Sequence, residues 1–167
     1  MAGKKRYFLA EEIGTEFDEK VLYINRCSKV VKGGRKFSFS ALILIGDGAG
    51  HVGIGFAKAN EVADAIRKGS EAARKHVLQF EMENETIPHE IMMDWDGAKI
   101  LLKPAPEGTG IVAGSKMRFV LEMGGIKNVV AKSLGSNNPL NLVRATFKAL
   151  ENLRNRKESL AIRGIEQ

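Results

Sequence analysis

The chain reads NRCSKVVKGGRK from Asn25 to Lys36. Five cationic residues surround a Gly-Gly pair in this stretch, and no acidic residue occurs between Lys20 and Asp47. Because glycine adopts positive φ, Gly33-Gly34 predicts a chain reversal between two strands, with the cationic side chains projecting from a narrow tip. A basic tip favours insertion between phosphate backbones, whereas the alternative is a solvated hairpin that only raises solubility.

The overall composition favours a binding protein with a polyanionic partner. The 167 residues carry a formal net charge of +6. Cys27 is the only cysteine, which excludes a disulfide framework and a cysteine-based zinc site and fits a reducing compartment. The N-terminal residues lack the apolar stretch of a signal peptide, and no apolar run approaches membrane-spanning length. We therefore expect a soluble, cytoplasmic protein.

The first half of the chain predicts three antiparallel strands and a helix. Residues 1–20 mix charges without periodicity and are expected to form a flexible arm carrying Lys4, Lys5 and Arg6. Residues 21–24, 37–45 and 51–56 have strand composition. Asn60 is expected to cap a helix that runs to about Gln79, with an apolar stripe that includes Val77 and Leu78. Residues 21–82 are accordingly predicted to form one domain.

The second half predicts a ββαβα unit. An acidic stretch, 81–96, marks the boundary, and a C-terminal α+β domain is expected over residues 83–167. Strand-like segments at 87–93 and 100–103 are joined by Asp96-Gly97, which predicts a hairpin turn. A helix is expected over 113–123, a strand over 126–131, and a final helix from Pro139 to about Arg156. The fold class predicted for the whole chain is α+β.

Two glycine-rich stretches imitate nucleotide-binding motifs. Gly48 to Gly53 matches the dinucleotide pattern, but these residues fall in a predicted hairpin rather than between a strand and a helix. Gly108 to Ser115 precedes a predicted helix and is compatible with an anion, a protein surface or a tight turn, but lacks the lysine of a P-loop. The histidines have no metal-ligand spacing, and Asp94 with Asp96 indicates a solvated turn. The sequence therefore predicts no catalytic residue, no metal and no cofactor.

The cations predict phosphate contacts rather than base reading. Arg26, Lys29, Lys32, Arg35, Lys36 and Lys58 are the expected RNA contacts, with further cations on the helix after Asn60. The alternation indicates that either Val30 or Val31 faces the sheet core, whereas the alternative is that these valines wedge against sugars or another protein. Because no aromatic pair suited to stacking several bases is evident, we expect RNA to be recognised by shape.

Five motifs carry a family resemblance. They occur in order at 25–39, 46–48, 52–59, 104–110 and 135–139, and include VGIGFAKA and GSNNP. Together they resemble the bacterial small-subunit ribosomal protein S-five family, over roughly Val21 to Leu153. The resemblance implies a double-stranded-RNA-binding-like domain followed by an α+β domain with a left-handed βαβ crossover.

The resemblance also implies a role and partners. It implies a non-catalytic constituent of the 30S subunit that binds 16S rRNA beside proteins four and eight, supports assembly and decoding accuracy, and helps form the mRNA entry channel. The spectinomycin-linked loop of the family matches Ser28, Lys29, Val30, Val31, Lys32, Gly33 and Gly34. Three residues of this loop are expected RNA contacts in addition to the cations: Ser28, Gly33 and Gly34. The accuracy-linked interface with protein four matches Gly110 and Arg118.

Two residues depart from the family pattern. His51 stands where arginine or lysine is usual, which puts one phosphate contact in doubt, and Ala57 stands where glycine is frequent, which affects a close RNA approach.

Two other functions compete with the ribosomal one. A free double-stranded-RNA-binding module would use the first domain alone, and a nucleotide-dependent enzyme would use Gly108 to Ser115.

Overall fold

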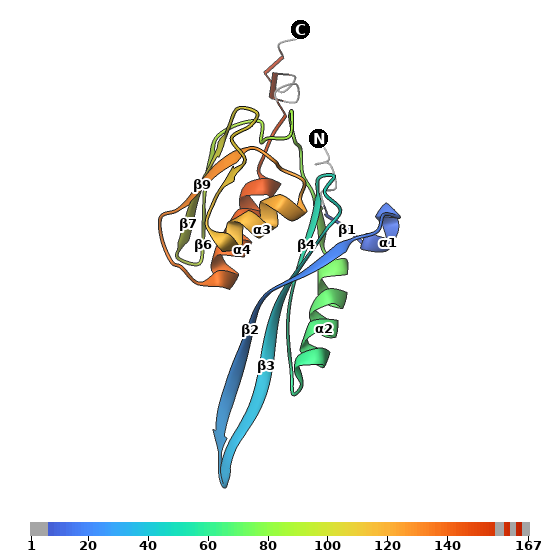
Figure 1. The fold of residues 1–167 in the computed structure, drawn as a ribbon, viewed down its shortest axis with the longest axis vertical. Helices are drawn as coiled ribbons and strands as arrows, with labels where there is room; N and C mark the ends of the chain where they lie inside the picture. The colour runs from blue at the N-terminus through green and yellow to red at the C-terminus, as the bar shows by residue number, and fades with distance from the viewer. Residues whose placement is uncertain (1–6, 156–158, 161–162, 165–167) are drawn as a thin grey trace. The chain divides into compact units, whose positions relative to one another are not determined.

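The computed structural model describes residues 7–155, 159–160 and 163–164, and it divides into two compact units. The first unit comprises Met1–Asp47 and His51–Leu78, and the second comprises Gly48–Gly50 and Gln79–Gln167. Each unit contains helices and a sheet, which confirms the predicted α+β class (Figure 1). No helix among the described residues is both long and apolar enough to cross a membrane.

The first unit is built on a five-stranded sheet in the order β1-β5-β4-β3-β2. The strands are β1 (Tyr7–Phe8), β2 (Asp18–Val31), β3 (Gly34–Gly46), β4 (His51–Ala59) and β5 (Val77–Gln79). The predicted three-stranded antiparallel arrangement corresponds to β2, β3 and β4, and the β2–β3 register shifts once, between Val21 and Tyr23. Strands β1 and β5 were not predicted, and they pair with each other.

Helix α2 (Val62–Arg74) covers one face of this sheet (Figure 1). Alternate β3 residues Ala41 and Ile43 pack with Ala65 of α2, as expected where side chains alternate between two faces. The helix lies very close to β4, because a Cβ added at Gly55 would be 1.8 Å from the carbonyl oxygen of Gly69. The glycines of β4 therefore admit the backbone of α2.

Two predictions for the first unit are wrong. Residues 7–20, expected to be an arm without regular structure, contain β1, helix α1 (Ala10–Ile13) and the start of β2. Lys4, Lys5 and Arg6 lie outside the described residues. Helix α2 has Glu61 rather than Asn60 as its N-cap, and it ends before the predicted Gln79. The apolar residues of β5 are fully buried and bond to β1, so tertiary pairing overrides the helical pattern there.

The second unit contains a four-stranded sheet in the order β6-β7-β9-β8. Its elements are β6 (Ile91–Trp95), β7 (Ala98–Pro104), β8 (Ile111–Val112), α3 (Ser115–Met123), β9 (Val129–Ser133) and α4 (Pro139–Glu151). Strand β8 was not predicted; it pairs in parallel with β9, and α3 connects the two. The left hand of this crossover stays a prediction.

The local signals of the second half are largely confirmed. Trp95 pairs with Ala98 across Asp96-Gly97, whose φ values are 46° and 79°, so this dipeptide forms the predicted hairpin turn. Helix α4 begins at Pro139 as predicted, but it ends at Glu151 rather than near Arg156, which lies outside the described residues. Strand β6 begins at Ile91, whereas the predicted strand began at Ile87. Residues 81–90 form a turn and irregular backbone instead.

Candidate nucleic-acid interface

Strands β2 and β3 form a projecting hairpin, which we call the finger and define as residues 27–38. Strand β4 pairs with β3 only as far as Phe39↔Ala59, whereas β2 and β3 continue to pair from Cys27↔Ser38 to Val31↔Gly34. At about 3.4 Å per residue, this two-stranded part extends the sheet by roughly 15 Å. Figure 1 shows it continuing past β4 and α2. Both of its faces are therefore open.

The turn of the finger differs from the predicted one by a residue. Val31 pairs with Gly34, so Lys32-Gly33 forms the turn, and Gly34 already belongs to β3. Gly33 and Gly34 have φ values of 103° and 147°, which confirms the predicted need for glycine. No heavy atom lies within 4 Å of a Cβ added at either position, so the tip is open for contact with another molecule.

The finger cations are distributed over both faces. All of the cationic residues predicted to contact RNA in this region are exposed. Lys29 lies directly opposite Lys36, and Arg35 lies opposite Val30 on the other face. A cation directly opposite another is unfavourable in a sheet. The pair therefore favours an anion at this position, because a bound phosphate would relieve the repulsion.

Aromatic and apolar groups accompany these cations. The Arg26 guanidinium lies 3.8 Å from the centroid of the Phe37 ring, so the side chain is held by a cation–π contact. Ser28 is exposed on the same face as Phe37, its register partner. Val30 is 74% exposed and Val31 is half-buried. The expectation that one valine faces the sheet core is wrong, because both lie beyond the part of β3 that β4 covers.

The sheet behind the finger contains the remaining predicted RNA contact. Lys58 is exposed on β4, with its Nζ 5.9 Å from the centroid of the Phe56 ring. Phe56 and Tyr23 are exposed aromatic residues on the sheet face opposite α2, and sequence reasoning missed this pair. The only sequence signal was that each lies in a strand near basic residues. Their alignment depends on the strand register.

The structure shows the contacts of His51 and Ala57, the two residues that depart from the family pattern. The His51 Nδ1 lies 2.7 Å from Oδ2 of Asp47, whose side chain is only 4% exposed. His51 is thus engaged at the start of β4. Ala57 is half-buried and lies opposite Ala41, on the α2 face of the sheet.

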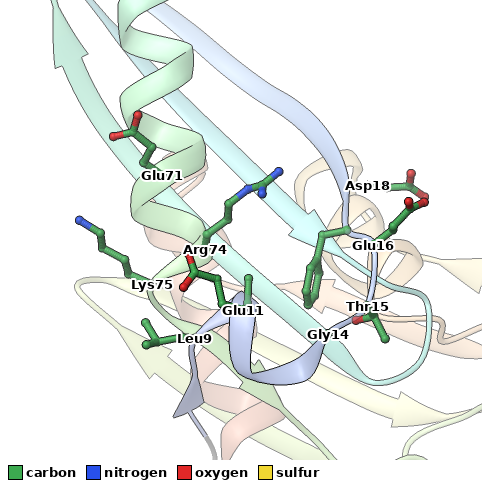
Figure 2. A pocket seen from close by; sticks show the side chains of 11 residues that line it. Leu9, Glu11, Gly14, Thr15, Glu16, Asp18, Glu71, Arg74 and Lys75 are labelled. Atoms are coloured by element: carbon green, nitrogen blue, oxygen red, sulfur yellow. The ribbon is translucent and has the colours of Figure 1, made fainter.

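A hollow of about 840 Å³ lies between the segment 9–18 and α2 in the first unit. Figure 2 shows its charged lining, in which Glu11, Glu16, Asp18 and Glu71 accompany Arg74 and Lys75. Acidic side chains outnumber basic ones there, so this hollow is unsuited to a polyanion.

Next to this hollow, Glu19 of β2 is bound to α2. Its carboxylate accepts hydrogen bonds from the Ser70 hydroxyl and, at 2.9 Å, from Nη2 of Arg74. The Ser70 hydrogen bond is the main cause that lowers the pKa of Glu19, and Arg74 adds to it, while burial acts in the opposite direction. The three residues tie β2 to the helix.

Gly110 and Arg118, matched to an accuracy-linked interface, lie in the second unit. The Gly110 N–H donates to Oδ1 of Asn128 at 3.1 Å, and its carbonyl accepts from the Val129 N–H at 3.1 Å. Arg118 is exposed on α3, where it lines a hollow of about 340 Å³ together with Lys132. The geometry leaves Arg118 accessible to a partner.

In both glycine motifs, backbone groups bond to other parts of the chain. Gly48 and Gly50 donate their N–H groups to the carbonyls of Met123 and Gly124, at 3.1 and 3.0 Å. These amides are therefore unavailable to a pyrophosphate, and β4 rather than a helix follows them. In the stretch from Gly108 to Ser115, the backbone of β8 pairs with β9. Among the described residues, no group of three or more His, Cys, Asp or Glu side chains is placed to hold a metal ion.

Comparison with known proteins identifies the family. Residues 17–81 match the family model described as Ribosomal protein S5, N-terminal domain, and residues 93–163 match that described as Ribosomal protein S5, C-terminal domain. The chain belongs to the ribosomal protein S5 family. This confirms the resemblance inferred from the five motifs, and the two matched domains agree with a two-domain α+β protein.

Curated relatives support the family over almost the full chain. The chain is 63% identical to the small ribosomal subunit protein uS5 of Protochlamydia amoebophila over 155 residues, which is 93% of each chain. It is 66% identical to the protein of the same name from Chlamydia abortus, over 90% of this chain and 92% of the relative. The corresponding protein of Chlamydia trachomatis serovar D is 65% identical over 136 residues.

Proposed function

We propose that this chain is a structural, non-enzymatic constituent of the small ribosomal subunit and binds 16S rRNA through the finger. Membership in the ribosomal protein S5 family and the names of its relatives support the ribosomal role. The 30S subunit in the cytoplasm is then its location. Neither a small-molecule substrate nor a membrane is part of this role.

The observation that carries the RNA-binding proposal is the finger with cations on both faces. A two-stranded ribbon is thin, and its exposed cations lie on opposite sides of it. Such a ribbon can contact phosphates of two RNA segments at once, because neither face is covered by α2 or β4. The proposed RNA contacts are Arg26, Ser28, Lys29, Lys32, Gly33, Gly34, Arg35, Lys36 and Lys58. With few base-reading groups at the tip, the finger would recognise folded RNA by shape.

The finer roles follow from the family resemblance. Residues 28–34 would form the spectinomycin-linked loop, and the open tip at Lys32-Gly33 suits a contact with RNA. Gly110 and Arg118 would contribute to an accuracy-linked interface with protein four, and the exposure of Arg118 supports this. Protein eight and mRNA near the entry channel would be further neighbours, and assembly of the subunit would depend on these contacts. The proposed domains are 21–82 and 83–167, and residues 7–20, which contain β1 and α1, belong with the first of them.

The salt dependence of RNA binding tests the finger. We expect Lys29→Ala with Lys32→Ala to weaken binding to 16S rRNA and to lower the slope of log K against log salt by about 0.7–0.9 for each phosphate that is no longer neutralised. The measurement is a filter-binding titration at several salt concentrations. Lys99→Ala with Lys103→Ala, two exposed lysines of β7, is the matched control and should leave the slope unchanged. An unchanged slope in the finger variant would show that these lysines do not contact phosphate.

Sedimentation tests the ribosomal role itself. The full chain should co-migrate with the small subunit in a sucrose gradient of cell extract at moderate salt. Exclusive recovery in the soluble fraction would favour a free double-stranded-RNA-binding module and overturn the ribosomal proposal.

A further inference from the structure

The face of the first sheet opposite α2 carries aligned rows of side chains. The register places Tyr23, Leu42 and Phe56 in one row across β2, β3 and β4, and Asn25, Ser40 and Lys58 in the next. This face is the one opposite α2, because the neighbouring β3 residues Ala41 and Ile43 pack on the helix and side chains alternate along a strand. We call the two rows the aromatic face.

Two aromatic rings on this face are accessible. Tyr23 is 41% exposed and Phe56 is 40% exposed, while Leu42 between them is only 2% exposed. The two aromatic residues are separated by one strand, so their backbones are roughly 10 Å apart. The two residues thus border a buried leucine, and each keeps part of its surface exposed to solvent. A single exposed apolar residue is common on protein surfaces, whereas two exposed aromatic residues in one row form a larger apolar surface on which a ligand can stack.

The charged side chains in the rows of this face are all cationic. Lys58 lies over the Phe56 ring at 5.9 Å, and Lys29 and Lys36 continue the same face into the finger. The rows from Tyr23 to Lys29 contain no acidic side chain. Rings and cations interleaved in this way match a ligand with flat apolar faces and a negatively charged backbone.

We infer that the aromatic face binds unpaired nucleotides of RNA, with bases stacked on Tyr23 and Phe56 and a phosphate near Lys58. The inference rests on the proposed function and deepens it by naming unpaired RNA as the ligand of this surface. Bases inside a double helix stack on one another, so only unpaired bases offer their faces to side-chain rings. The absence of acidic groups in these rows favours RNA over a protein partner, since a protein surface usually presents both signs of charge.

An abasic oligomer separates base stacking from phosphate contacts. The full chain is titrated against a short, unstructured, dye-labelled single-stranded RNA and against an abasic ribose-phosphate oligomer of the same length, with fluorescence anisotropy as the readout. The RNA with bases should bind more tightly than the abasic oligomer. Tyr23→Leu and Phe56→Leu should each weaken binding of the RNA with bases by roughly tenfold and leave binding of the abasic oligomer unchanged. Leucine is chosen because it keeps Leu42 covered.

Two further variants complete the experiment. Tyr23→Phe retains the ring and should keep the affinity of the original protein. Tyr7→Leu removes a comparably exposed ring, 40% accessible, from β1 at the other edge of the same sheet, and should have no effect. Because the comparison of the two oligomers needs no substitution, it remains decisive even if a leucine variant fails to fold.

Three results would overturn the inference. The original protein could bind both oligomers equally, both leucine variants could keep full affinity, or the leucine variants could lose incorporation into subunits while RNA affinity is unchanged. The last result would indicate a protein partner. None of these outcomes changes the salt slope expected for the finger variant. A failure of the inference about the aromatic face is therefore distinguishable from a failure of the proposed function.

Discussion

Gly55→Ala tests the close approach of α2 to β4. An added Cβ would lie 1.8 Å from the carbonyl oxygen of Gly69 and 2.8 Å from the backbone nitrogen of Ala73. Ordinary contact begins near 3.4 Å, so the helix and the strand would have to separate by about 1.5 Å. Both obstructing atoms belong to the backbone, and no change of side-chain rotamer can relieve the overlap.

The magnitude follows from the packing that such a shift disturbs. Overpacking a core costs about 1–3 kcal/mol when side chains can adjust. Here the helix itself must move, which also loosens the contacts of Ala65 with Ala41 and Ile43. We expect a loss of about 3 kcal/mol in the free energy of unfolding. For a protein of this size, that corresponds to a fall in Tm of about 6–12 °C.

Thermal unfolding monitored by two signals measures this effect. Far-UV circular dichroism follows both units, and fluorescence of Trp95, the single tryptophan, follows the second unit. The circular dichroism transition should move to lower temperature, with a smaller change in the fluorescence transition. Gly114→Ala is the control, since its Cβ would meet only the Met117 Cε at 3.5 Å, and it should cost under about 1 kcal/mol. A Tm of Gly55→Ala within about 2 °C of the original would refute the steric argument.

Two other predictions concern polar contacts. Glu19→Gln removes the charge that Ser70 and Arg74 stabilise. Because the pKa of Glu19 is lowered in the folded state, its contribution is present above the unfolded pKa and is lost as pH falls through the folded pKa. The variant should therefore be less stable than the original at neutral pH, with the difference vanishing in acid; a difference independent of pH in urea titrations would contradict this. Asn138→Ala removes the N-cap of α4, which accepts the Leu140 N–H at 3.1 Å, and should cost about 1 kcal/mol by urea unfolding; an unchanged midpoint would show that water replaces the cap.

Features of the fold that depend on residues adjacent in the sequence were predictable from the sequence. The Asp96-Gly97 turn and the Pro139 helix start depend on φ preferences of single residues, and both were found. Strands β1 and β8 were not predictable. Each has only two residues and exists because a distant strand supplies hydrogen-bond partners, β5 for one and β9 for the other. Such pairs leave no periodic signal in a local window.

The positive charge of the candidate site was predictable from the sequence, but the face of the sheet on which each side chain lies was not. The cations of the finger were evident because no acid interrupts the stretch from Lys20 to Asp47. The assignment of each cation of β2 to a face depends on the register of this strand, which shifts between Val21 and Tyr23. Without that irregularity, the aromatic ring of Tyr23 would be placed on the α2 face. Alternation alone could not reveal the aromatic face, since a shift of one residue inverts every assignment beyond it.

The register of the finger also limits how its sequence can change. The turn at Lys32-Gly33 sets which β2 residue lies opposite each β3 residue. Single substitutions at the exposed positions would change the local charge and leave the two faces in place. An insertion or deletion of one residue in either strand near the tip would instead exchange what the two faces present on that strand. The length of this hairpin should therefore tolerate less variation than the identity of its side chains.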